Sequence, residues 1–313
     1  MQPNKQSLSS APASASIFDR MLIRQKRDRY AAKNAEYNFL HNWTAQQIID
    51  RLKDIKRTFP LGLIMGPRFD ENIHVDIINT AGITKSVHMD LSYNIARTHC
   101  AHTAIQADEE FLPIKSDSLD IVLTILNLHT VNDLPGALIQ INRALKPDGV
   151  FIGSMLGGET LYELRESFTQ AEIKLKGGIS PRVAPFADKK QMGALLQRAG
   201  YALPVVDSEI VTITYDNVFK LMHDLRYMAE SNSITDRSKD YTGKELIMEA
   251  ARYYQENFTA ADGKIEATFE IIFLIGWAPH ESQQQPLRPG SAQHRLADAL
   301  SSEEIKTGIK SAP

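Results

Sequence analysis

Residues 61–70 read Leu-Gly-Leu-Ile-Met-Gly-Pro-Arg-Phe-Asp, and this stretch decides the fold. The apolar run Leu61–Met65 has the length of a buried strand, and Gly66 and Pro67 end it abruptly. Glycine lets the backbone approach a ligand closely, and proline fits the first turn of a helix, where no N–H group is needed. The stretch predicts a strand that leads into a helix beside a ligand. A plain tight turn without a ligand is the alternative.

Four further apolar runs follow, and helix-length segments near 68–80, 92–99, 133–145 and 158–175 separate them. Such alternation predicts parallel strands joined by right-handed crossovers, with helices on both faces of the sheet. Sheets of this kind bind ligands beyond the carboxyl ends of their strands. The four runs are Ser86–Met89, Thr103–Ala107, Asp120–Leu126 and Gly149–Met155.

The pattern changes after residue 200. Val205–Thr214 and Thr268–Trp277 each predict a long strand, and helices are expected at 217–230 and 244–258 between them. The fold class is therefore α/β, with a doubly wound, mostly parallel, seven-stranded sheet and a helical insertion, residues 216–264, before the last strand. This insertion is a natural cap over a substrate.

The chain ends carry little apolar periodicity, so disordered tails are expected at 1–16 and 283–313. N-terminal helices are expected over 17–57, and the main α/β domain is expected over 58–282. Residues 17–33 hold six basic side chains, all of them within 20–33, against the two acids Asp19 and Asp28. That helix predicts either a solvated face or a peripheral contact with a membrane surface or an acidic partner.

Composition excludes several classes of protein. Among 313 residues, 35 Lys and Arg face 38 Asp and Glu, giving a net charge of −3, which argues against a nucleic-acid partner. The single cysteine, Cys100, rules out an internal disulfide and suits a reducing compartment. There is no run of 18 apolar residues, so we expect a soluble, intracellular protein without a spanning helix.

Acidic side chains follow the second and third strands. Asp90 comes 24 residues after Gly66, where a carboxylate can accept from both hydroxyls of a ribose. Its alternative role is to cap the helix that starts near Ser92. Asp108 and Glu109 follow the third strand, where a carboxylate can accept from the amine of an adenine while Phe111 or Leu112 packs on the ring. The alternative interpretation of these acids is an acidic turn on the protein surface.

His129 follows the fourth strand and is the candidate for acid–base chemistry in this part of the sequence. At the edge of a cleft it would act as an acid or base near neutral pH, or it closes a loop through a hydrogen bond.

We predict no bound metal. A non-haem iron site needs two histidines and a carboxylate. The pairs His74/Asp76 and His88/Asp90 have the His-x-Asp spacing, but nine histidines and 38 acids in 313 residues produce about one such pair by chance. The segment from His99 to His102 is no stronger as evidence for a metal site.

The order of elements, the glycine after strand one and the acids after strands two and three resemble the class I S-adenosylmethionine-dependent methyltransferases. Longer strings, over residues 17 to 290, resemble the methyltransferase-fold assembly factors of respiratory complex I, which are described as arginine hydroxylases. These strings are Ile17–Arg20, Ala107–Pro113, Leu128–Pro135, Leu145–Gly153, Gly157–Arg165, Glu230–Asn232 and Ile275–Trp277.

This resemblance implies an S-adenosylmethionine-dependent fold and a protein substrate, an arginine of the complex I subunit near the quinone site. It assigns Gly66 to the cofactor loop, Asp90 to the ribose, Asp108 and Glu109 to the adenine, and His129 to the reaction cleft. The protein would work in the cytoplasm of a bacterium or on the matrix side of a mitochondrion. A non-catalytic assembly scaffold and a malonyl-carrier O-methyltransferase are the alternative functions.

Three positions depart from the first motif of the superfamily. Ile64 replaces an acid or amide, and Arg68 and Asp70 replace glycines. Each lost contact costs about 1–3 kcal/mol, so we expect weakened cofactor binding. Arg68 is expected to pair with Asp90 or with an acidic ligand.

Overall fold

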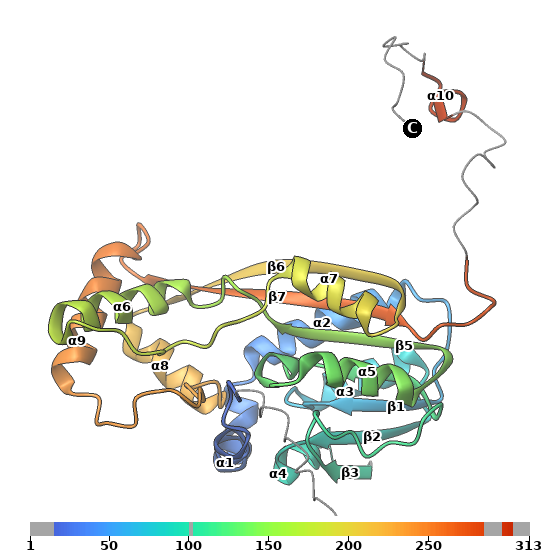
Figure 1. Cartoon of the computed structure of the whole chain (residues 1–313), viewed down its shortest axis with the longest axis horizontal. Coiled ribbons are helices and arrows are strands. Elements are labelled where there is room, and N and C mark those ends of the chain that lie inside the picture. The colour runs from blue at the N-terminus through green and yellow to red at the C-terminus, as the bar shows by residue number, and fades with distance from the viewer. Residues whose placement is uncertain (1–15, 100–102, 285–295, 303–313) are drawn as a thin grey trace, which may run out of the picture. The chain divides into compact units, whose positions relative to one another are not determined.

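The computed structural model describes residues 16–99, 103–284 and 296–302. Most of the expected tails, 1–16 and 283–313, lies outside these ranges, as does Cys100. The sheet has seven strands in the order β3-β2-β1-β4-β5-β7-β6, in which β1 to β5 are parallel and β7 runs antiparallel to β5 and β6 (Figure 1). The predicted fold class is thus confirmed. The strands are β1 Leu61–Met65, β2 Lys85–Asp90, β3 Thr103–Gln106, β4 Leu119–Thr124, β5 Leu145–Leu156, β6 Ala202–Tyr215 and β7 Ile265–Trp277.

Two apolar clusters show which helices cover the sheet. Helices α2 (Phe39–Lys53) and α3 (Glu71–Ala81) pack on one face, and α5 (Leu134–Ala144) and α7 (Lys189–Arg198) pack on the other. Alternate residues of β1 divide between the two clusters, since Ile64 belongs to the first and Leu63 to the second. This burial on both faces is what the nearly continuous apolar runs of the sequence require.

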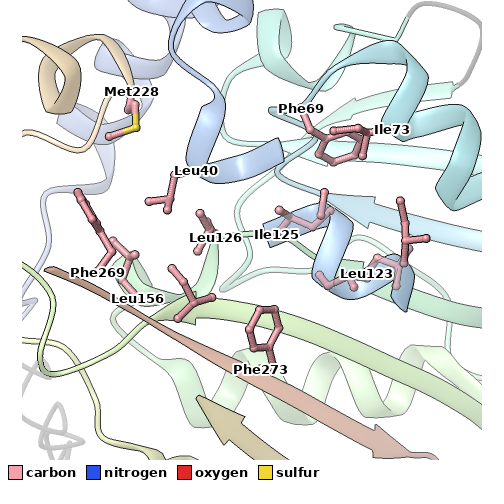
Figure 2. Packing of buried hydrophobic residues seen from close by; sticks show 14 of the residues in the cluster. Leu40, Phe69, Ile73, Leu123, Ile125, Leu126, Leu156, Met228, Phe269 and Phe273 are labelled. Carbon is pink, nitrogen blue, oxygen red and sulfur yellow. The ribbon is translucent and has the colours of Figure 1, made fainter. Parts of the chain in front are cut away.

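Three helices form a cap at one end of the sheet (Figure 1). They are α6 (Tyr162–Lys176), α8 (Val218–Tyr227) and α9 (Lys244–Asn257), and the last two lie between β6 and β7 as the sequence predicts. The core continues into this cap, because Met228, which ends α8, joins the same cluster as Leu40 of α2 and Phe269 of β7 (Figure 2).

The N-terminal segment contains α1 (Arg20–Tyr30) and a 3-10 helix, η1 (Ala31–Glu36). Asp19 caps α1, because its carboxylate accepts from the backbone N–H of Leu22 at 3.0 Å. Phe18 forms an isolated antiparallel bridge with Ile234, so this segment is bound to the loop that follows α8.

Two element boundaries differ from the sequence predictions. Strand β5 begins at Leu145 rather than Gly149, because Leu145 is buried and pairs with Leu119 before a bulge shifts the register. Asp148 lies in this bulge and has a φ of 64°. The predicted turn is therefore present, but inside the strand. Helix α4 spans only Tyr93–Ala96, shorter than the predicted 92–99.

Residues 280–313 form a separate unit from residues 1–279, and their described part includes the short helix α10 (Leu296–Ala299). Nowhere in the described ranges is there a helix with the length and apolarity needed to cross a membrane.

Candidate functional site

The two carboxylates that follow β2 and β3 converge at the carboxyl edge of the sheet. Asp90 and Glu109 are both fully buried, and both lie near Nη1 of Arg27 from α1. That nitrogen donates to Asp90 Oδ2 at 2.9 Å and lies 3.7 Å from Glu109 Oε1. Burial lowers the pKa of Arg27, but the charges of Asp90 and Glu109 outweigh it and raise the pKa above its ordinary value.

Arg20, two turns earlier on α1, binds the acids after β3. Its Nη2 donates to Asp108 Oδ1 at 2.7 Å and also contacts Glu109, while its Nη1 donates to the carbonyl oxygen of Thr130 at 3.0 Å. Burial would raise the pKa of Asp108, but the hydrogen bond and charge of Arg20 lower it. Helix α1 therefore neutralises these acids with two of its own guanidinium groups.

Three of the six basic residues of the N-terminal segment thus face inward. Lys26 donates to the carbonyl oxygens of Ser231 and Asn232 at 2.7 and 2.6 Å. Burial lowers the pKa of Lys26 to about 8. The exposed basic side chains, Arg24, Arg29 and Lys33, are what remains for any external partner.

The residues assigned to an S-adenosylmethionine site are suitable in type, but their carboxylates bind arginine in this conformation. Gly66 has a φ of 69°, and a Cβ there would lie 3.0 Å from the carbonyl oxygen of Ile125, so glycine is required at this turn. Asp90 does not cap α4; it accepts from the N–H of Ser92, which is itself the cap. Phe111, which was expected to pack on the adenine ring, is 77% exposed in this conformation.

The expected pairing of Arg68 with Asp90 is not found, because Arg68 binds other partners. Its side chain is buried and runs toward the cap, where Nη1 donates to Glu230 Oε1 at 3.0 Å and Nη2 donates to the carbonyl oxygen of Leu126 at 2.7 Å. Asp70, the other departure from the glycine motif, accepts from the amides of Asn38 and Asn42 on the α2 side. Arg68 and Asp70, the two residues that stand in place of glycines, thus connect the loop after β1 to neighbouring elements by hydrogen bonds.

Glu230 also contacts His129, which the sequence predicts to be an acid or base. The Nε2 of His129 lies 3.0 Å from Glu230 Oε2. Burial would raise the pKa of Glu230, but the charges of His129, Arg68 and Arg27 hold it well below its ordinary value. Glu230 enters this site because the preceding Ala229 has a φ of 63°, a conformation that favours glycine and is retained at functional sites.

A cavity of about 360 Å³ opens beside Glu230 and His129, between the sheet edge and the cap. Its walls are mostly apolar and include Leu40, Leu156, Met228 and Phe269, which are drawn in Figure 2. Arg27 also lines it, whereas Gly66, Asp90 and Asp108 do not. Ionisable groups converging in an apolar cavity are typical of binding sites.

The sequence did not predict that Glu230, Arg27 or Arg20 belongs to this site. Glu230 and Arg20 belong to strings that carry the family resemblance, which was the available signal. The loop between α6 and α7 also reaches the cavity, which Arg182, Val183, Ala184 and Phe186 line. Arg182 is not turned to solvent, because its Nη2 pairs with Glu172 at 2.7 Å.

Comparison with known proteins identifies the family. A family model described as a methyltransferase domain matches residues 74–153. The mitochondrial arginine-hydroxylase NDUFAF5 of Danio rerio is 38% identical over 287 residues, which cover 90% of this chain and 89% of that protein. The chain belongs to the arginine-hydroxylase NDUFAF5 family. This confirms the resemblance and the expected class, an enzyme of the methyltransferase superfamily.

Two other comparisons set this member of the NDUFAF5 family among wider relatives. A malonyl-[acyl-carrier protein] O-methyltransferase of Gallionella capsiferriformans is 34% identical over 180 residues, 58% of this chain and 59% of that protein. The structure of the YcgJ protein from Bacillus subtilis covers 76% of this chain and 99% of its own, with a TM-score of 0.52 and 14% identity, and supports the fold alone.

Proposed function

We propose that the protein hydroxylates an arginine side chain of a protein substrate, a complex I subunit near the quinone site, during assembly. The family name supports the reaction, and the mitochondrial relatives support action in a mitochondrion. We propose the matrix side as the place of action in a eukaryote and the cytoplasm as the equivalent place in a bacterium. We expect the substrate arginine to enter the cavity beside Glu230.

The observation that carries this proposal is the carboxylate of Glu230, of which only 13% of the side chain is exposed, on the wall of a mostly apolar cavity. Among the described residues, Glu230 makes one hydrogen bond through each oxygen, to Arg68 and to His129. An ionised carboxylate has about four acceptor positions, so further positions are left for a substrate guanidinium. Hydrogen bonds between arginine and carboxylate are strong and directional, and apolar walls suit the methylene groups of the side chain.

His129 is placed to move a proton in this site. Its Nε2 faces Glu230, and within the described residues its buried Nδ1 has no hydrogen-bond partner. The Glu230 carboxylate orients the ring, as carboxylates do for catalytic histidines. His129 therefore serves as the acid or base for a group bound in the cavity.

For the cofactor, we propose that Asp90 would bind the ribose and Asp108 with Glu109 the adenine once Arg27 and Arg20 leave them. S-adenosylmethionine would supply an electrophilic sulfonium group, whereas the oxygen atom of the hydroxylation has to come from an external oxidant, molecular oxygen together with a two-electron reductant, with the second oxygen atom leaving as water. Binding would therefore be coupled to a movement of α1, and the arginines make it weaker than in a site with free carboxylates.

The same ion pairs favour one alternative, a non-catalytic assembly scaffold. If α1 keeps Asp90 and Glu109 permanently neutralised, the fold serves as a binding surface rather than as an enzyme. A malonyl-carrier O-methyltransferase is the remaining alternative, and the relative from Gallionella supports it over a shorter part of the chain.

Mass spectrometry of complex I subunits separates the three functions. A strain that lacks the endogenous protein is complemented with this chain or with an empty vector. An arginine that carries one additional oxygen only in the complemented strain supports the proposal. Restored assembly with an unmodified subunit would instead identify a scaffold, and rescue of a biotin requirement would identify the carrier methyltransferase.

A further inference from the structure

A second cluster of ionisable side chains lies among α3, β2 and the turn after α4, and none of its residues lines the cavity. It consists of Glu71, His74, His88 and His99. The three histidines are buried, with 1%, 0% and 3% of their surfaces exposed, whereas the Glu71 side chain is 64% exposed. The mechanism proposed above uses none of these residues.

The fold brings one ligand atom from each of three residues together. Glu71 and His74 are three positions apart in α3 and share one face of the helix. The Nδ1 atom of His99 lies 2.6 Å from Glu71 Oε2, and the Nδ1 atom of His74 lies 3.7 Å from Glu71 Oε1. In the described part of the chain, the ligand atoms of Glu71, His74 and His99 all lie within 4.8 Å of one another.

The imidazole rings are held in place by their neighbours. The rings of His74 and His99 are nearly parallel, at 8° with centroids 4.6 Å apart, and Phe69 stacks on His99 at 5.3 Å. The Nε2 atom of His74 lies 3.1 Å from the Nε2 atom of His88, so one proton is shared between those two nitrogens. If His74 donates that proton, its Nδ1 atom is the acceptor nitrogen of the ring, and this atom lies 3.7 Å from Glu71 Oε1.

We propose that Glu71, His74 and His99 bind a divalent first-row transition metal ion, with His88 as the outer partner of His74. Two imidazoles and one carboxylate suit such ions and leave coordination positions open for water on the exposed side of Glu71. Ligating histidines nearly always have a hydrogen-bond partner on the other ring nitrogen, which is the place of His88. The proposal is independent of the arginine cavity.

The sequence prediction of no metal rested on His-x-Asp spacing, and that spacing is not what the fold uses. Asp90 binds Arg27, and Asp76 is exposed on α3. The carboxylate of the cluster comes instead from Glu71, three residues before His74, and its second histidine comes from a distant turn. No local motif joins these three positions.

The test is a titration of the full-length, metal-free protein with ZnCl₂ by calorimetry and with CoCl₂ by visible absorption. We expect one ion per chain. Glu71→Ala should weaken binding by more than about tenfold, because it removes a ligand, and His88→Gln should weaken it by roughly tenfold or more. Asp76→Ala, an exposed acid on the same helix, is the matched control and should bind as the wild type does.

Glu71→Ala is the decisive variant, because its exposed side chain can be removed without disturbing the core. Its metal-free melting curve should match that of the wild type. Absence of saturable binding in the wild type, or equal binding by wild type and Glu71→Ala, would show that the cluster is only a histidine–carboxylate hydrogen-bond network. Loss of binding in Asp76→Ala would also overturn the assignment, because it would place the ion elsewhere on α3.

Discussion

The Nη1 atom of Arg27 lies 2.9 Å from Oδ2 of Asp90, and both side chains are almost completely buried. The acid that we propose to bind the ribose is thus neutralised by a guanidinium from the N-terminal helix of the same chain. The arrangement makes α1 part of the site, and it determines how the protein should respond to changes at either residue.

Arg27→Ala should strongly destabilise the protein. It leaves Asp90 as a buried charge without its partner, and breaking a buried ion pair in this way typically costs about 3–5 kcal/mol. The free energy of unfolding, measured by urea denaturation, should fall by that amount. Arg24→Ala, which removes an exposed partner of Asp28 on the same helix, should change it by less than about 1 kcal/mol. Equal effects of the two variants would refute this account of Arg27.

Arg20→Ala should tighten S-adenosylmethionine binding. The ligand then no longer competes with a guanidinium for Asp108 and Glu109, and hydrogen bonds to charged groups are each worth about 1.5–3 kcal/mol. Calorimetry should give an affinity roughly tenfold higher than that of the wild type. Arg29→Ala, an exposed arginine on the same helix, is the control. An unchanged affinity in Arg20→Ala would mean that α1 does not obstruct the cofactor.

Acid should destabilise the protein partly through Glu230. Its pKa is lowered on folding, because His129, Arg68 and Arg27 outweigh the effect of burial. A lowered pKa contributes stability that is complete above the unfolded value, roughly 4.3, and that is lost as the pH falls below it. The free energy of unfolding should therefore decrease more steeply below about pH 5 in the wild type than in Glu230→Gln.

The control for this pH profile is Glu245→Gln, which changes an exposed acid at the start of α9. Its profile should follow that of the wild type. If the profile of Glu230→Gln also runs parallel to the wild type, the carboxylate is not held in its charged form by folding.

A large side chain at position 184 should block the cavity. Ala184 lies on the cavity wall, in the loop between α6 and α7, and a tryptophan there would fill space that the substrate needs. Ala184→Trp should lose arginine modification in the complemented strain and keep its melting temperature, whereas Ala184→Ser should retain both. Full modification by Ala184→Trp would place the substrate elsewhere.

The sequence predicted the sheet well, because each strand of a parallel sheet is a short apolar run and each crossover is a helix. Asp90 and Glu109 were placed at the correct edge for the same reason, since the residue after a strand has a position that topology determines. Glu230 and Arg27 were not recognised as site residues. They reach the site from the cap and from α1 through contacts more than 60 positions apart, which no local pattern encodes.

The bulge at Asp148 and the left-handed turn at Ala229 show a second limit of sequence reasoning. Neither residue is a glycine, yet both have a positive φ. Tertiary contacts therefore impose these backbone conformations against the residue's own preference, and the second of them is what brings Glu230 to His129.

The most direct test of the central claim, that Glu230 receives the arginine of the substrate, is the modified fraction of that arginine in a deletion strain. The strain is complemented with wild type, Glu230→Gln or Glu245→Gln at equal protein levels, and complex I subunits are analysed by mass spectrometry. We predict that Glu230→Gln reduces the hydroxylated fraction by at least about tenfold, because the charge-assisted hydrogen bonds to the guanidinium are lost, while Glu245→Gln leaves it unchanged. Equal hydroxylation with Glu230→Gln and wild type would contradict the claim.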